Sequence, residues 1–148
     1  MNGSDKQFEH ILAIEDRKGQ RIITLNQKMY SLGRSTKNSI VIFDRQVSRT
    51  HATIIKQQKG NRNCTFWIYD GNLQGKRSTN GIVINKKRLL SHQLQVGDLI
   101  MLGDNTVLKY YQFSTKTVQL LRSAKKLGNS TISTILMSKQ EIKQTVVL

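Results

Sequence analysis

The chain has 148 residues, a single cysteine and a formal net charge of +15, with 24 Lys+Arg against 9 Asp+Glu. This length predicts one domain with a terminal extension, and no stretch approaches the roughly 18 consecutive apolar residues of a membrane-spanning helix. Residues 1–10 are too polar for a signal peptide, so we expect a cytoplasmic protein.

The basic excess is spread along the whole chain. Residues 1–113 contain 18 basic and 8 acidic side chains, and residues 114–148 contain 6 and 1. Such a charge favours an anionic partner, which could be nucleic acid, an anionic membrane or a phosphorylated protein. Scattered surface lysines often serve solubility alone, so the charge does not select among these partners.

Most of the chain reads as short β-strands separated by turn residues. Nine short segments read as strands: 11–14, 21–26, 30–32, 40–43, 52–57, 65–69, 81–85, 99–102 and 107–112. Gly, Asp and Asn fall between the segments, and the chain has no proline to interrupt a strand. The pattern predicts an all-β, twisted antiparallel β-sandwich. It divides the chain into a domain at residues 8–113 and an extension at residues 114–148.

The extension has a different pattern, and it is either flexible or partly helical. Apolar residues recur every third position in the basic segment 116–127, which predicts a short amphipathic helix that ends at Gly128. A weaker helix start lies at Ser138 and Glu141, which have the spacing of a capping box.

Three short motifs combine hydroxyl, guanidinium and amide groups at predicted turns. They are Gly33-Arg34, Ser48-Arg49-Thr50-His51 and Ser78-Thr79-Asn80-Gly81. A guanidinium can hold phosphate oxygens through two parallel hydrogen bonds, and hydroxyl groups add neutral donors. Asn-Gly is a strong turn dipeptide, because both residues tolerate a positive φ. Each motif alone is also compatible with an ordinary surface turn.

The order and spacing of these motifs resemble the forkhead-associated (FHA) domain, a reader of phosphothreonine peptides. Segment 94–100 also resembles the Leu-x-x-Gly-Asp strand entry of that family. The resemblance implies that Arg34 and Ser48 are the principal phosphate ligands and that Arg49 is an auxiliary contact. It further implies that Thr79 shapes the site and that Asn80 bonds the ligand backbone.

The same resemblance gives Gly33, His51 and Gly81 architectural roles, with His51 holding the binding loop against the scaffold. A catalytic role for His51 is not supported, because its motif has no acidic partner and the chain has no Gly-x-Ser-x-Gly sequence. The histidines and Cys64 have no metal-ligand spacing, and no nucleotide-binding glycine loop occurs. We therefore expect no enzyme, no metal and no cofactor.

One segment departs from the family pattern, the long and basic stretch 71–77. It either adds Lys76 and Arg77 to the rim of the site or leaves them in solvent.

The predicted function is a phosphothreonine-dependent module that docks a phosphorylated partner in kinase-linked signalling. The alternative is a basic β domain that binds nucleic acid, but aromatic residues make up only 6% of the chain and single-strand binders stack bases on such residues. Thr131, Thr134 and Thr145 lie in the extension, so its own phosphorylated tail is a further candidate ligand.

Overall fold

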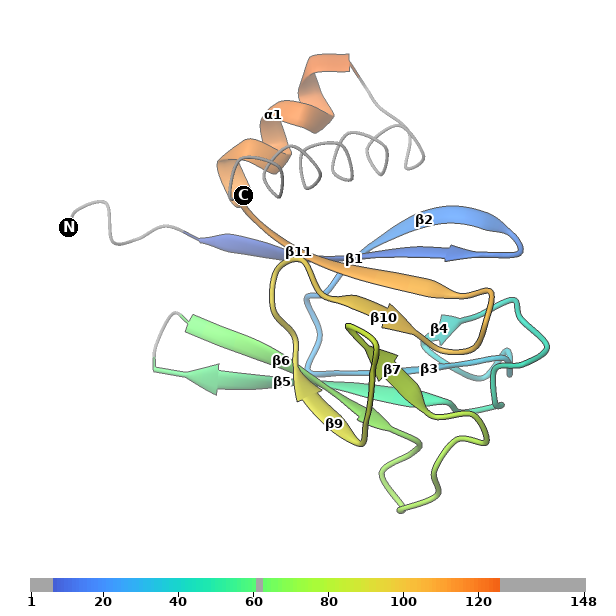
Figure 1. Ribbon diagram of the computed structural model, residues 1–148. Helices are drawn as coiled ribbons and strands as arrows, with labels where there is room; N and C mark the ends of the chain where they lie inside the picture. The colour runs from blue at the N-terminus through green and yellow to red at the C-terminus, as the bar shows by residue number, and fades with distance from the viewer. Residues whose placement is uncertain (1–6, 61–62, 126–148) are drawn as a thin grey trace.

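A computed structural model describes residues 7–60 and 63–125. Two β-sheets pack face to face in it, and one helix lies outside them (Figure 1). The six-stranded sheet has the order β2 (Gly19–Thr24), β1 (Phe8–Asp16), β11 (Val107–Ser114), β10 (Leu99–Met101), β7 (Ile82–Ile84) and β8 (Lys87–Leu89). The five-stranded sheet has the order β4 (Ile40–Val41), β3 (Met29–Gly33), β5 (Ala52–Lys59), β6 (Asn63–Asp70) and β9 (Ser91–Gln93).

The β-sandwich predicted from the sequence is confirmed, and each of the nine predicted segments overlaps a strand. The prediction missed β8 and β9, which have three residues each and lack an apolar alternation long enough to recognise. One pair also departs from the antiparallel expectation, because β3 and β4 run parallel with Leu32 opposite Ile40.

The core lies between the two sheets and follows the strand period of two. Leu12 and Ile14 of β1 point inward and are buried, as are Ile54 of β5 and Phe66 and Ile68 of β6. Full burial of such side chains stabilises a fold by about 1.5–3 kcal/mol each. The core therefore fixes the strands and leaves the connecting loops at the two ends of the sandwich.

Helix α1 (Thr115–Lys125) follows β11 directly and covers part of the outer face of the six-stranded sheet (Figure 1). The Ser114 hydroxyl accepts a hydrogen bond from the Thr117 backbone N–H at 3.1 Å and so caps the helix. Val118 is buried against Ile11 and Tyr111. The described part of the predicted helix is thus confirmed, whereas the second helix start at Ser138 lies outside the described residues. No helix in the described ranges is long and apolar enough to cross a membrane.

The sequence predicts a turn at Asn80-Gly81, and this dipeptide lies in the loop between β6 and β7. Gly81 has a φ of +77°, but Asn80 is not among the described residues with a positive φ. Two consecutive positive φ values occur instead at Asn85 (51°) and Lys86 (73°), which join β7 to β8. The two-residue hairpin lies there, and Asn80-Gly81 belongs to a longer loop.

Candidate functional site

Three loops meet at one end of the sandwich, the right-hand end in Figure 1. They are residues 34–39 after β3, residues 42–51 after β4 and residues 71–81 after β6. The Arg34 backbone N–H donates to the Ser48 carbonyl oxygen at 3.0 Å. The Thr79 N–H donates to the Ser48 hydroxyl oxygen at 2.9 Å, so Ser48 links all three loops.

A surface pocket of about 300 Å³ lies where these loops converge. Its lining consists of Arg34, Ser48, Arg49, Thr50, Asn72, Lys76, Arg77 and Thr79. Four of the five predicted ligands are therefore brought together in one place. The lining carries four cationic side chains and no carboxylate, which is the electrostatic environment that a phosphate group prefers.

The side chain of Arg34 is held in a defined direction. Its Nε donates to the Val47 carbonyl oxygen at 3.0 Å. Its two terminal NH₂ groups have no acceptor among the described residues, and Arg34 is exposed. Arg34 thus presents a planar pair of donors whose orientation is fixed before any ligand arrives.

Ser48 is held in place through both its backbone and its side chain. Its N–H donates to His51 Nδ1 at 3.0 Å, and its hydroxyl oxygen accepts from Thr79. Because that oxygen acts as an acceptor toward the protein, its own hydrogen is available to donate into the pocket.

His51 is fully buried and joins two loops. Nδ1 accepts from Ser48, so Nε2 carries the proton and donates to the Gly81 carbonyl oxygen at 2.7 Å. Burial lowers the pKa of His51 below 6.5, and only the hydrogen bond to Gly81 and the charges of Asp70 and Asp44 oppose this shift. The neutral ring is the form that these two hydrogen bonds require.

Gly33 is required by the close approach of two chain segments. A Cβ at this position would overlap the Arg49 carbonyl oxygen, which also accepts a hydrogen bond from Asn38 Nδ2 at 2.5 Å. Any larger residue would separate the loop that carries Arg34 from the one that carries Arg49.

Asn80 lies apart from the other predicted ligands. Its Nδ2 donates to the Gln46 carbonyl oxygen at 2.8 Å. It lines a neighbouring hollow of about 300 Å³ with Gln46, Gly81, Val83, Met101, Gly103 and Asp104. Thr79 therefore stands at the pocket lined by Arg34 and Ser48, and Asn80 stands at the next hollow along the surface.

The stretch 71–77 forms an internally bonded loop. The Asn72 side-chain oxygen accepts from the Gln74 N–H at 3.0 Å and from the Lys76 N–H at 2.9 Å. Gly71 has a φ of +85°, and a Cβ there would overlap the Lys76 carbonyl oxygen. The pocket residues to which the sequence assigned no role are Thr50, Asn72, Lys76 and Arg77. Among them, only Lys76 and Arg77 could have been suspected from the sequence, because they are basic.

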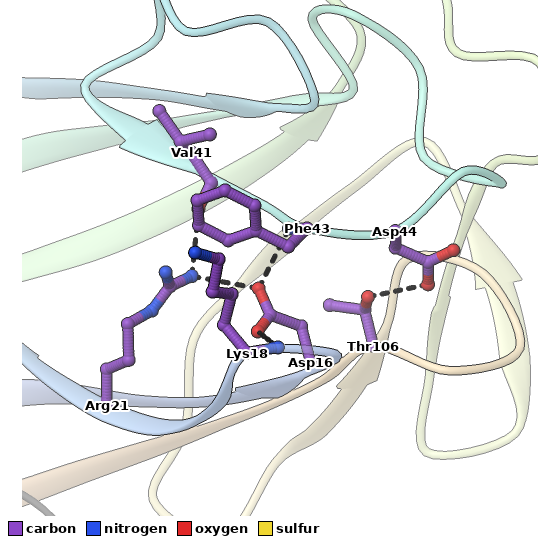
Figure 2. Close-up of polar contacts among 7 residues, drawn as sticks. All are labelled: Asp16, Lys18, Arg21, Val41, Phe43, Asp44 and Thr106. Atoms are coloured by element: carbon purple, nitrogen blue, oxygen red, sulfur yellow. Dashed lines mark hydrogen bonds and ion pairs between the residues drawn. The ribbon is translucent and has the colours of Figure 1, made fainter.

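The start of the second loop is tied to the β1–β2 hairpin (Figure 2). The carboxylate of Asp16 accepts from the Phe43 backbone N–H at 2.9 Å and pairs with Arg21 at 3.0 Å. Lys18 and Arg21 lie over the ring of Phe43, at 4.9 and 5.4 Å from its centroid. Sequence reasoning did not find this anchor, because its members are distant along the chain.

A second tie fixes the same loop one residue later (Figure 2). The buried carboxylate of Asp44 accepts from the Thr106 hydroxyl at 2.7 Å and from the Gln46 N–H at 2.9 Å. Gln46 in turn exchanges hydrogen bonds with Asp104. The loop that carries Ser48 and Arg49 leaves β4 of the five-stranded sheet, and these two ties hold it against the six-stranded sheet.

The opposite end of the sandwich contains a polar cluster around His10. His10 Nδ1 lies 2.5 Å from the Tyr110 hydroxyl, and Cys64 Sγ lies 3.4 Å from His10 Nε2. Burial lowers the pKa of His10 and raises the pKa of Tyr110 to about 12. No group of three or more metal-ligating side chains occurs within the part of the chain that the structure describes.

Comparisons with known proteins agree with this geometry. The family model of the FHA domain matches residues 30–103, so the chain belongs to the FHA domain family. Members of this family bind phosphothreonine peptides and are generally not catalytic.

Individual relatives extend the match. The protein sll1895 of Synechocystis is 38% identical over 104 residues, which cover 70% of this chain but only 15% of that protein. The crystal structure of the Slr1951 protein from Synechocystis is 36% identical, with a TM-score of 0.67, and covers 69% of this chain and 96% of its own. A structure from a study of phosphothreonine-dependent FHA domain interactions is 27% identical, with a TM-score of 0.55, and covers 69% of this chain and 94% of its own.

Proposed function

We propose that this chain is a phosphothreonine-dependent docking module, which binds a phosphorylated partner in kinase-linked signalling and performs no catalysis. The observation that carries the proposal is the pocket where three loops place Arg34, Ser48 and Arg49 together without any carboxylate. A phosphothreonine brings a charge of about −1.5 to −2 and three acceptor oxygens, which such a pocket matches.

Each predicted residue has a role in this proposal. Arg34 binds two phosphate oxygens, the Ser48 hydroxyl donates to a third, and Arg49 adds charge at the rim. Thr79 positions Ser48 through its N–H. Asn80 stands just beyond Thr79, where its side-chain oxygen is placed to accept from the backbone of a peptide that crosses from the pocket to the neighbouring hollow.

The proposed module comprises residues 8–113 of a cytoplasmic protein, with residues 114–148 as an extension. Thr131, Thr134 and Thr145 lie outside the described residues. A phosphorylated form of that extension is a candidate ligand, because tethering raises its effective concentration.

Calorimetry with one peptide in three forms tests the proposal. The peptide is selected from a phosphothreonine library and is compared with its phosphoserine and unphosphorylated forms, and an oligonucleotide tests the nucleic-acid alternative. Arg34→Ala should weaken binding by about 1.5–3 kcal/mol, the range for a hydrogen bond to a charged group, while Arg17→Ala removes the same charge outside the pocket. Equal affinity for all three peptides, or tighter binding of the oligonucleotide, would overturn the proposal.

A further inference from the structure

The phosphate pocket carries more positive charge than one phosphothreonine can neutralise. Arg34, Arg49, Lys76 and Arg77 contribute four charges, and a phosphothreonine contributes about −2 at most. A surplus of about two positive charges remains at the site.

No ion pair within residues 7–60 and 63–125 neutralises this surplus. The ion pairs among the described residues are Arg21–Asp16 and His92–Asp98, and neither contains a pocket cation. Asp70 precedes the loop, but its Oδ1 accepts from both the N–H and the hydroxyl of Ser78, which is buried. The four cations therefore face solvent without a carboxylate partner in the described part of the chain.

Lys76 and Arg77 are also held differently from the cations on open surface. Their backbone belongs to a loop that closes on itself, with the Asn72 N–H donating to the Lys76 carbonyl oxygen at 2.9 Å and the Lys76 N–H donating to the Asn72 side chain. The hydroxyl of Ser78 fixes the end of the loop by accepting from the Gly81 N–H at 2.8 Å. A backbone fixed in this way holds the two side chains beside the pocket, so that a ligand has to order only their rotamers.

We infer that Lys76 and Arg77, with Asn72, form a second anion subsite within the same pocket, next to the residues that bind the phosphothreonine. This inference rests on the proposed function and specifies the ligand class. The natural ligand carries a second anionic group, a phosphate or a carboxylate, within a few residues of the phosphothreonine. A second phosphate would neutralise the remaining two positive charges and a carboxylate one of them, whereas a single phosphothreonine leaves about half of the pocket charge unmatched.

The test uses a panel of peptides and two charge-matched variants. Each peptide has one central phosphothreonine and carries a second phosphothreonine, or a glutamate, at each neighbouring position in turn. Lys76→Gln/Arg77→Gln removes the subsite. Lys59→Gln/Lys116→Gln removes the same charge from exposed positions that do not line the pocket. Lys76→Arg/Arg77→Lys keeps the charge.

We expect the best doubly anionic peptide to bind native protein about tenfold more tightly than the singly phosphorylated one, since charge-assisted contacts of this kind are strong. That gain should fall below about threefold in Lys76→Gln/Arg77→Gln and persist in the other two variants, and it should shrink as salt is raised. If only a second phosphate increases the affinity, the natural ligand carries a second phosphorylated residue. If glutamate increases the affinity equally, the natural ligand carries an acidic residue near the phosphothreonine.

Two failures are distinguishable. If the singly phosphorylated peptide binds and no second anion improves the affinity, or if both glutamine variants lose the gain equally, the subsite is wrong and the proposed function stands. If no phosphorylated peptide binds, both are overturned.

Discussion

His51 is the residue on which the geometry of the site depends most directly, and His51→Leu tests this dependence. Leucine has a similar volume and suits the buried position, but it has no nitrogen atoms. The change removes the acceptor for the Ser48 N–H and the donor for the Gly81 carbonyl oxygen. Both groups would lose their partner in one substitution.

The expected loss of stability follows from these two groups. A buried polar group without a partner costs about 1–3 kcal/mol. Gly81 is buried and Ser48 is half-buried, so water can reach Ser48 in part. We expect the free energy of unfolding to fall by about 2–4 kcal/mol. Peptide affinity should fall as well, because Ser48 and the 71–81 loop are no longer joined.

Urea denaturation and calorimetry with the phosphothreonine peptide measure the two effects. His92→Leu is the matched control, because His92 also has a ring nitrogen bonded, to Asp98 at 2.8 Å, but lies on β9 away from the pocket. His92→Leu should lower stability and leave the affinity unchanged. Unchanged affinity in His51→Leu, or a stability loss below about 1 kcal/mol, would refute this role of His51.

Further predictions concern the loops and the pH dependence. Gly33→Ala should weaken peptide binding in calorimetry, because the added Cβ would displace the Arg49 carbonyl oxygen and so move Arg49 at the rim of the pocket. An unchanged affinity would show that the loops adapt to the added methyl group. In thermal melts, Gly81→Val should lower the melting temperature more than Asn80→Ala, because valine strains a φ of +77° whereas Asn80→Ala removes one exposed hydrogen bond. An equal decrease in both variants would contradict this prediction. Lys86→Gly should raise the free energy of unfolding by about 0.5–1 kcal/mol in urea, because it relieves a φ of 73° in the hairpin turn, and a loss would contradict that reading. Burial lowers the folded-state pKa of both His10 and His51 below 6.5, so the unfolded chain binds more protons. The free energy of unfolding should therefore decrease as the pH falls from about 6.5 toward the folded-state pKa values, by up to about 1.4 kcal/mol per pH unit for each histidine. In urea denaturation across this pH range, the free energy of unfolding should depend less steeply on pH in His10→Gln than in the native protein. A native free energy of unfolding that does not change with pH would contradict the lowered pKa values.

Local sequence determined the strands and the residue types of the site. Runs of β-branched and aromatic residues bounded by turn residues are a property of adjacent positions, so segments such as 52–57 and 65–69 were predictable before their partners were known. The motifs containing Arg34, Ser48 and Thr79 were equally visible, because their chemistry lies within a few residues. The short β8 and β9 were not, because three residues are too few to show a period.

Only the tertiary structure decided how these pieces combine. Asn80 follows Thr79 directly, yet its bond to the Gln46 carbonyl oxygen places it at a separate hollow. Asp16 anchors Phe43 across 27 positions of sequence, and Lys76 reaches the pocket because Gly71 and Asn72 fold the loop back on itself. These contacts join residues that are far apart along the chain, or depend on loop conformations that no periodic pattern encodes. They exist only once the core has packed and brought the loop ends together.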